Sequence, residues 1–74
     1  MPKVPRDIDQ QQAIRALVRT GGVYQPRQGK GSHQAVTMPS GQIVVIPYGT
    51  IRVGTLTGII KEAGLTVQQF IDSL

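Results

Sequence analysis

The sequence of 74 residues predicts an α+β fold in the order α-β-β-β-α, with a three-stranded antiparallel sheet between two helices in the chain. Two segments carry apolar residues at helical spacing. Between them lie three segments with β-branched residues or strict alternation, separated by turn residues. A sheet of three strands needs a covering layer in so small a chain. We therefore expect both helices to pack on one face of the sheet and to leave the other face exposed.

Residues 1–8 are expected to form an extended lead into a single domain over residues 9–74, because two prolines interrupt this segment. Asp7 and Asp9 are both candidate N-caps of the first helix, and Asp7 with Gln10 resembles a capping box. The apolar stripe of this helix and the glycines that end it are Ile14, Leu17, Val18, Gly21 and Gly22.

Three strands are predicted after this helix, over residues 23–25, 33–38 and 43–46. Pro26 places the first strand at an edge of the sheet. Residues 39–42, which read Pro-Ser-Gly-Gln, form the turn of a hairpin between the other two strands. Because the segment from Ile43 to Ile46 is β-branched throughout, we expect it to be the best-buried strand.

A second helix is expected to begin near Gly54 and to end at Gly64, after a connection that starts at Tyr48. Its apolar stripe consists of Leu56, Ile59, Ile60 and Ala63. Thr66 with Gln69 forms a second capping-box pattern and predicts a last short helix, in which Phe70 belongs to the core.

The composition indicates a negatively charged partner. Eight Lys or Arg stand against four Asp or Glu, which gives a net charge of +4, and the isoelectric point is about 10.2. In a small domain this surplus favours nucleic acid. The absence of cysteine excludes disulfides and thiolate metal sites. No apolar run reaches the roughly 20 residues of a membrane helix, and the first residues do not resemble a secretory signal.

The most informative segment reads Arg-Gln-Gly-Lys-Gly-Ser-His and ends at the only histidine of the chain, His33. Histidine is the residue type that ordinarily gains or loses a proton near neutral pH. Strand alternation places His33 on the face opposite to Val36. If the chain is an enzyme, His33 is therefore the first candidate for proton transfer.

Elimination narrows the chemistry of this segment. One histidine without cysteine cannot form a metal site, and the acidic residues lack ligand spacing, so no metal or other cofactor is expected. Ser32 adjoins His33, and neighbouring strand residues point to opposite faces, so no catalytic triad is indicated. The Gly-Lys-Gly-Ser run also lacks the spacing of a Walker loop.

Cleavage of RNA without metal remains open, because the 2′-hydroxyl of RNA is already an internal nucleophile. A single imidazole can move one proton as base or acid. Lys30 or Arg27 can offset the phosphate charge, and glycines such as Gly31 let backbone N–H groups approach the substrate.

The same residues also allow purely structural roles. The glycine-rich segment can form a tight turn, with His33 as a surface residue. Arg15 and Arg19 lie four residues apart, and we interpret them as a solvated helix face. We interpret Tyr24 and Tyr48 as the rim of the core, because one aromatic residue per strand does not form a stacking array for bases.

Three motifs become specific when their order and spacing are taken together. They are Lys-Gly-Ser-His at residues 30–33, Ser-Gly-Gln-Ile-Val-Val-Ile-Pro at residues 40–47, and Gly-Thr-Leu-Thr-Gly-Ile-Ile-Lys-Glu-Ala-Gly-Leu-Thr at residues 54–66. With the helices around them they cover roughly residues 9–74. Over this span the sequence resembles the HicA, or YcfA-like, family of toxin–antitoxin ribonucleases.

The resemblance implies a fold like that of a double-stranded-RNA-binding domain and an mRNA-cleaving toxin, or mRNA interferase, whose catalytic residue is His33. Around it, we expect substrate to be bound by Arg27, Lys30, Gly31 and Ser32. The resemblance also implies a HicB-type antitoxin that binds the toxin and blocks its active site. We expect a monomeric free toxin, a larger assembly with the antitoxin, and a cytoplasmic location.

The chain departs from the family pattern at two places. Many members have histidine after the proline that ends the strand, where this chain has Tyr48 after Pro47. Many have lysine before Gly-Thr-Leu, where this chain has Val53 preceded by Arg52. These departures leave His33 as the sole imidazole.

Two other functions compete with the ribonuclease. One is a non-catalytic module that binds double-stranded RNA through its charge and shape. The other is a protein-interaction adaptor that uses the exposed face or edge of the sheet. Strand scission that depends on His33 would distinguish the ribonuclease from both.

Overall fold

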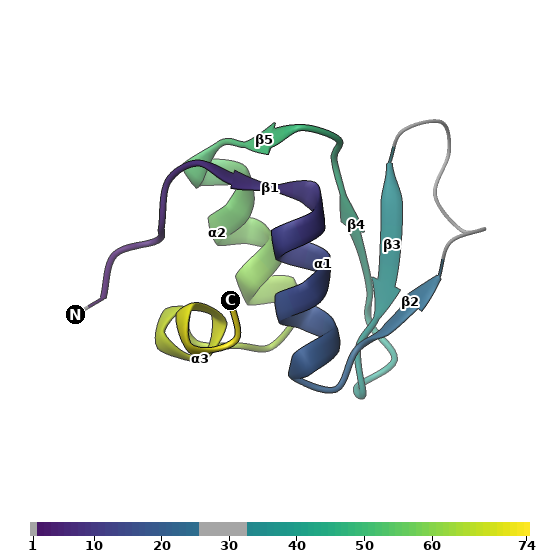
Figure 1. Cartoon of the computed structure of the whole chain (residues 1–74). Coiled ribbons are helices and arrows are strands. Elements are labelled where there is room, and N and C mark those ends of the chain that lie inside the picture. The colour runs from purple at the N-terminus through teal and green to yellow at the C-terminus, as the bar shows by residue number, and fades with distance from the viewer. Residues whose placement is uncertain (1, 26–32) are drawn as a thin grey trace.

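The computed structural model describes residues 2–25 and 33–74, and Figure 1 shows a mixed arrangement of helices and strands within them. In chain order the elements are β1 (Ile8–Asp9), α1 (Gln10–Arg19), β2 (Val23–Gln25), β3 (Gln34–Thr37), β4 (Ile43–Ile46), β5 (Thr50–Ile51), α2 (Val53–Glu62) and α3 (Val67–Asp72). The predicted α+β class is confirmed, because the main sheet and the two longer helices follow the order α-β-β-β-α.

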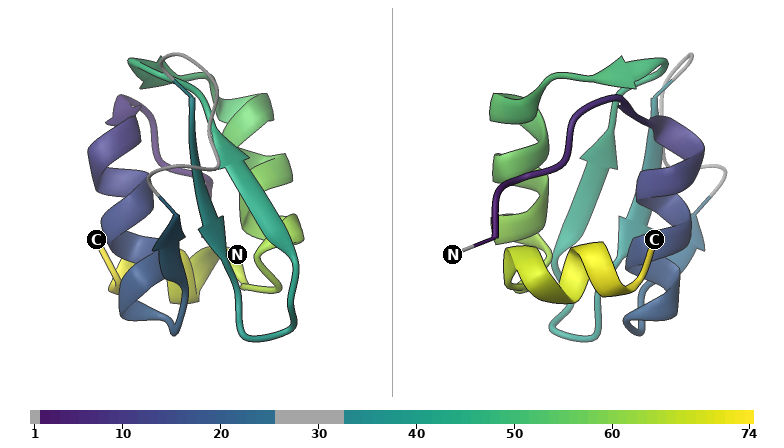
Figure 2. Two further views of the ribbon diagram at one scale, coloured as in Figure 1. Left: turned by 90° about the vertical axis from the view of Figure 1, so that its right-hand side faces the viewer. Right: turned by 60° about the vertical axis from the view of Figure 1, so that its left-hand side comes forward.

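The sheet and the helices form two layers. Strands β2, β3 and β4 make an antiparallel sheet in that order. Helices α1 and α2 cover one face of the sheet, and α3 crosses beside them near one end (Figure 2). In the described part of the chain, no helix lies over the opposite face. This confirms the prediction that both longer helices pack on the same side of the sheet.

Helix α1 begins with a capping box formed by Asp9 and Gln12. The Asp9 carboxylate accepts a hydrogen bond from the Gln12 backbone N–H (2.8 Å), and the Gln12 side-chain oxygen accepts one from the Asp9 N–H (3.0 Å). The box predicted for Asp7 with Gln10 is wrong. Asp7 lies in the left-handed region at φ +61°, and Gln10 turns inward with only 5% of its surface exposed.

A second strand pair, β1 with β5, was not predicted. Ile8 faces Ile51 in this antiparallel pair, and both side chains are buried. Ile8, the last residue of the expected lead, is therefore part of the core, and Val4 packs against the same core. Strands of two residues are too short to show a period-2 pattern, so nothing in the local sequence indicates this pair.

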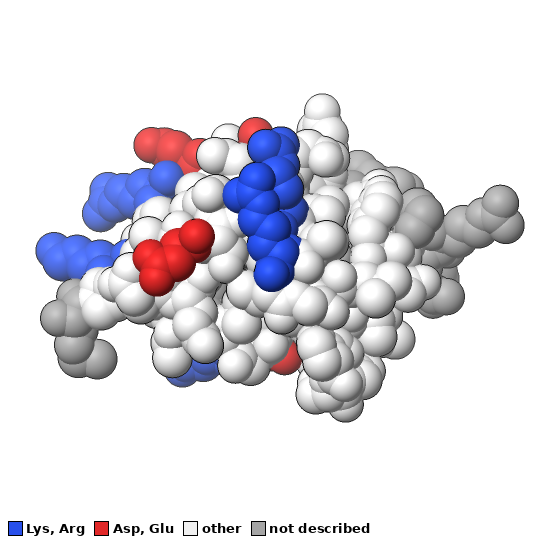
Figure 3. Space-filling model, turned by 60° about the horizontal axis from the view of Figure 1, so that its bottom comes forward, with Lys and Arg blue, Asp and Glu red and all other residues white. Residues whose placement is uncertain are grey.

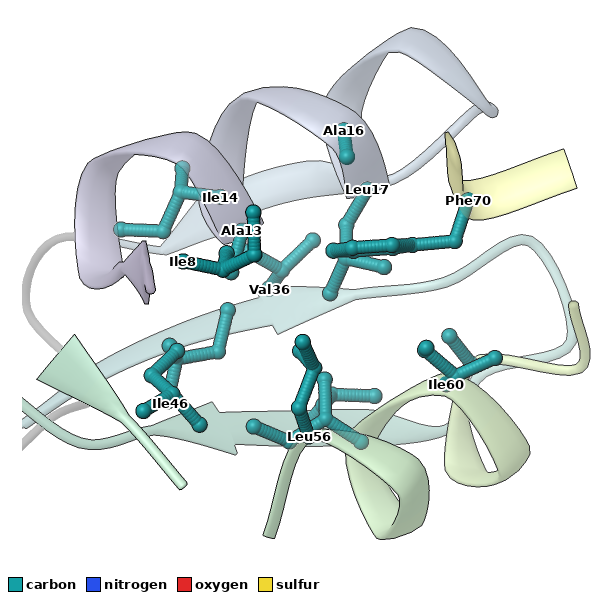
Figure 4. Close-up of a cluster of buried hydrophobic side chains, with 14 of the residues drawn as sticks. Ile8, Ala13, Ile14, Ala16, Leu17, Val36, Ile46, Leu56, Ile60 and Phe70 are labelled. Carbon is teal, nitrogen blue, oxygen red and sulfur yellow. The ribbon is translucent and has the colours of Figure 1, made fainter. Parts of the chain in front are cut away.

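The hydrophobic core lies between the sheet and the three helices (Figure 4). Phe70 extends from α3 toward Leu17 of α1, and neither side chain is exposed. The buried core cluster comprises Ile8, Ala13, Ile14, Ala16, Leu17, Val36, Met38, Val44, Ile46, Ile51, Leu56, Ile59, Ile60, Ala63 and Phe70. The apolar stripe predicted for the second helix and the core position of Phe70 are confirmed.

The ends of α2 and α3 also follow the sequence pattern. Gly64 follows Ala63, the C-cap of α2, and adopts φ +75°, a conformation that glycine accepts without strain. Thr66 caps α3 through a complete capping box: its hydroxyl accepts from the Gln69 N–H (3.1 Å), and the Gln69 side chain accepts from the Thr66 N–H (2.8 Å). Both predictions are confirmed.

The expectation that β4 is the best-buried strand is wrong, because two of its four residues are exposed. Val44 and Ile46 have no exposed surface, whereas Ile43 and Val45 are 49% and 50% exposed. The reason is the single covering layer. Successive residues of a strand point to opposite faces, and only one face carries helices.

Gly22 brings the end of α1 very close to the sheet. A Cβ atom at this position would lie 2.6 Å from Val36 Cγ1, 2.8 Å from the Leu17 carbonyl oxygen and 2.9 Å from Met38 Sδ. Gly21, just before it, adopts φ +108°. The two glycines therefore end the helix as predicted, and Gly22 also has a packing role.

Candidate nucleic-acid interface

His33 lies directly before β3 at one end of the sheet, and its side chain is exposed. Gln34 faces Ile46 in the register of β3 and β4. Continuing this register by one residue places His33 opposite Pro47. The imidazole is therefore accessible at the end of the sheet where β4 finishes.

The predicted substrate-binding residues Arg27, Lys30, Gly31 and Ser32 lie outside the described residues. The structure thus describes one member of the predicted site, His33. The roles assigned to the other four stay predictions.

Gln10 connects α1 to this end of the sheet through two hydrogen bonds. Its side-chain amide donates a hydrogen bond to the carbonyl oxygen of Ile46 (3.1 Å), and its backbone N–H donates to the carbonyl oxygen of Gly49 (3.1 Å). The first residue of α1 is thereby tied to the segment that follows β4. The spacing of Gln10, four residues before Ile14, places it on the inner side of the helix, but its partner Ile46 lies 36 positions away and could not be predicted from this spacing.

A hydrogen bond joins Tyr24 of β2 to the residue next to His33. The Tyr24 hydroxyl donates to the side-chain oxygen of Gln34 at 2.7 Å. Tyr24 also faces Val36 in the register, so its ring lies on the sheet face that α1 covers. Because β2 is an edge strand, the ring is still 40% exposed.

Two hollows border α1 on this side of the molecule, and both include Gln11. One, of about 260 Å³, is lined by Gln11, Ile14, Arg15, Val18 and Tyr24. The other, of about 210 Å³, is lined by Asp9, Gln10, Gln11, Tyr48 and Gly49. We call the first the α1–β2 groove. The sequence could not indicate it, because its lining comes from a helix face and an edge strand.

The two arginines of α1 differ in their contacts. Arg19 donates from Nη1 to the carbonyl oxygen of Ser73 (2.9 Å). Arg15 has no hydrogen bond or ion pair within residues 2–25 and 33–74. Figure 3 shows Lys and Arg side chains in separate groups, with Asp and Glu side chains beside some of them. On that face the positive charge is therefore divided rather than gathered in one patch.

The positions where the chain departs from the family pattern are exposed. Tyr48 is 73% exposed beside the smaller hollow, and Val53 is 39% exposed at the start of α2. Arg52 occupies the N-cap of α2, but its side chain makes no capping hydrogen bond. We expected both tyrosines at the rim of the core. Tyr24, which packs beside α1, fits this expectation better than the more exposed Tyr48.

The described residues contain neither a metal-binding cluster nor a membrane-spanning helix. No three His, Cys, Asp or Glu side chains among residues 2–25 and 33–74 are grouped so that they could hold a metal ion. No helix in this part of the structure is long and apolar enough to cross a membrane.

Comparison with known proteins assigns the chain to a family. A family model described as the HicA toxin of bacterial toxin–antitoxin systems matches residues 11–65. The match runs from α1 to the residue after Gly64 and includes His33. No curated protein matches the chain.

Proposed function

Because the chain belongs to the HicA toxin family of bacterial toxin–antitoxin systems, we propose that it is an mRNA-cleaving endoribonuclease that uses His33 and needs no metal. The observation that carries this proposal is the place of the only histidine. His33 is exposed at the end of the sheet, within the matched residues, and no second imidazole exists in the chain.

The proposed reaction is an internal transesterification. The RNA 2′-oxygen attacks the adjacent phosphorus, the new O2′–P bond forms and the P–O5′ bond breaks. The 2′-hydroxyl loses a proton and the departing 5′-oxygen gains one, so the products are a 2′,3′-cyclic phosphate and a 5′-hydroxyl. His33 transfers one of these protons as base or acid, a contribution of roughly 100- to 10,000-fold.

The segment before His33 would bind the scissile phosphate. Arg27 and Lys30 supply positive charge, the small Gly31 allows backbone N–H groups to approach, and Ser32 adds a hydroxyl donor. A guanidinium or ammonium group beside the phosphate stabilises the charge that increases in the transition state.

Cleavage by the purified chain in the presence of a chelator tests the proposal. The parent protein should cut a single-stranded RNA and should leave the same sequence in DNA intact, because DNA lacks the 2′-hydroxyl. His33→Ala should lower the rate by roughly 100-fold or more. Gln42→Ala, an exposed change in the β3–β4 turn, is the matched control and should cut like the parent.

Cleavage by His33→Ala at the parent rate would refute the catalytic assignment. Loss of cleavage on chelation would refute metal independence. Binding of double-stranded RNA with a steep salt dependence and no scission would instead indicate a non-catalytic module.

The partner is the second part of the proposal. Family membership implies an antitoxin, and we propose that it is of the HicB type, binds over His33, and forms a larger assembly with the cytoplasmic, otherwise monomeric toxin. Expression of the chain alone should stop growth, whereas His33→Ala should not. Co-expression with the protein of the adjacent reading frame should restore growth, and the two proteins should purify together.

A further inference from the structure

We propose that the α1–β2 groove binds one nucleobase of the RNA near the cleaved bond, with Tyr24 stacking on the base and Arg15 contacting a phosphate. This inference rests on the proposed function, because both name RNA as the ligand. It adds a binding subsite on the described residues, apart from the segment that precedes His33.

The shape and lining of the groove suit a single flat ring. Ile14, Val18 and Tyr24 supply apolar surface, and Val18 and Tyr24 are 42% and 40% exposed despite being apolar or aromatic. The volume of about 260 Å³ lies just below the roughly 300–1,000 Å³ of small-molecule pockets. A single base is of a size that such a space can hold. Gln11 at the rim offers an amide that can pair with a base edge.

The charge at the rim is complementary to RNA. Arg15 lines the groove, is exposed, and has no hydrogen bond or ion pair within the described residues, so its guanidinium donors are available to a ligand. Guanidinium groups bind phosphate through two parallel hydrogen bonds. Among the described residues, no Asp or Glu lines this groove, so none of their carboxylates repels a phosphate there. An aromatic ring with a neighbouring cation is the usual arrangement for single-stranded nucleic acid.

The groove is joined to the catalytic end of the sheet. The hydroxyl of Tyr24 donates to Gln34, and Gln34 is covalently bonded to His33. This hydrogen bond limits rotation of the Tyr24 ring, so the stacking surface is held in place before RNA arrives. Tyr24 lies on the helix-covered face of the sheet, whereas strand alternation assigns His33 to the opposite face. A base against Tyr24 would therefore hold the RNA at the edge strand β2, and the RNA would pass around that edge to reach His33. The sequence pattern favoured the rim of the core for Tyr24, and its exposure beside Arg15 is what adds the second role.

Tyrosine fluorescence gives a direct readout of stacking. The chain has two tyrosines and no tryptophan, so Tyr48→Phe leaves Tyr24 as the only strong fluorophore. With His33→Ala added to prevent cleavage, single-stranded RNA should quench this emission in a saturable way. Inorganic polyphosphate, which has charge but no bases, should not quench it. RNA that binds, as measured by anisotropy, without any quenching would overturn the proposal.

Affinities in the His33→Ala background separate the contributions of the groove. Tyr24→Ala should weaken RNA binding by about 5- to 100-fold, while Tyr24→Phe keeps the ring and most of the affinity. Arg15→Gln should weaken it by about tenfold. Arg6→Gln, which removes a positive charge outside the groove, is the matched control and should have a smaller effect. Thermal melting of each variant checks that the fold is intact.

The outcomes distinguish this inference from the proposed function. Quenching and groove-dependent binding without any cleavage would refute the ribonuclease and keep the base site. Cleavage that depends on His33, with Tyr24→Ala and Arg15→Gln binding RNA like the parent, would overturn the base site alone. The base site would also be refuted if these two variants no longer bound the antitoxin but bound RNA normally, because a protein would then occupy the groove.

Discussion

The two faces of the sheet are built from the same kind of residue but have different surroundings. Within β4, Val44 and Ile46 are fully buried under the helices, whereas Ile43 and Val45 are about half exposed on the other side. Each face of β4 carries one isoleucine and one valine. The helical layer, and not the hydrophobicity of the side chain, therefore decides which positions form the core.

The residues that stabilise the sheet are therefore expected on its helix-covered face, and the histidine proposed for catalysis on the opposite face. Burial contributes about 25 cal/mol per Å² of apolar surface, so the inner face supplies most of the stabilising energy of the sheet. Strand alternation assigns His33 to the outer face, where substitution costs little. Four predictions test this separation, in order of decreasing effect.

The strongest test compares two isoleucines of one strand. Ile46→Ala should lower the free energy of unfolding by about 2–5 kcal/mol, because it opens a cavity under the helices. Ile43→Ala, with 49% of its surface already exposed, should cost much less. Chemical denaturation of both variants measures the difference. Equal losses of free energy of unfolding would mean that the sheet face opposite to the helices is also covered in solution.

Gly22 tests how tightly α1 approaches the inner face. Gly22→Ala should destabilise by about 1–3 kcal/mol, because the new methyl group meets Val36, the Leu17 carbonyl and Met38. Gly54→Ala is the matched control, since a Cβ atom there has no atom within 4 Å. Thermal melting should show a lower midpoint for the first variant only. An unchanged midpoint for Gly22→Ala would show that the interface can relax.

Neighbouring valines test the polarity of the two faces. Val44→Thr should cost about 1–3 kcal/mol, because it buries a hydroxyl that must lose its water. Val45→Thr should be close to neutral, because the hydroxyl faces solvent. Urea unfolding of the pair measures this. A large loss for Val45→Thr would contradict the exposed outer face.

The smallest effect on stability is expected at His33. Its side chain is exposed, so His33→Ala should change the free energy of unfolding by less than about 0.5 kcal/mol while it abolishes cleavage. Paired unfolding and RNA-cleavage assays test both halves of this statement. A substantial loss of stability would indicate that the imidazole has a structural role.

Local patterns predicted most of the fold. The apolar stripe of α2, the capping box of Thr66 with Gln69, and the turn before β4 all depend on residues close in sequence, and all are confirmed. The capping box of α1 was assigned to the wrong pair, since the inward turn of Gln10 toward Ile46 depends on a contact across 36 positions. The β1–β5 pair was missed for the same reason.

The candidate site was predictable only in part. His33 could be selected because it is the only imidazole and ends a basic, glycine-rich run. The groove that includes Arg15 and Tyr24 could not be selected, because each residue in isolation is typical of a solvated helix face or of the rim of a core. Only the packing of α1 against β2 brings these two residues to one groove.

Local sequence patterns specify the order of the elements, the ends of most helices, and the one side chain suited to proton transfer. These follow from periodicity, capping and composition, which act over a few residues. Tertiary packing, in contrast, leaves Val45 exposed and Val44 buried, joins Gln10 to Ile46 by a hydrogen bond, and brings Tyr24 and Arg15 to one groove. These features arise from packing between distant segments, and no local pattern of residues encodes them.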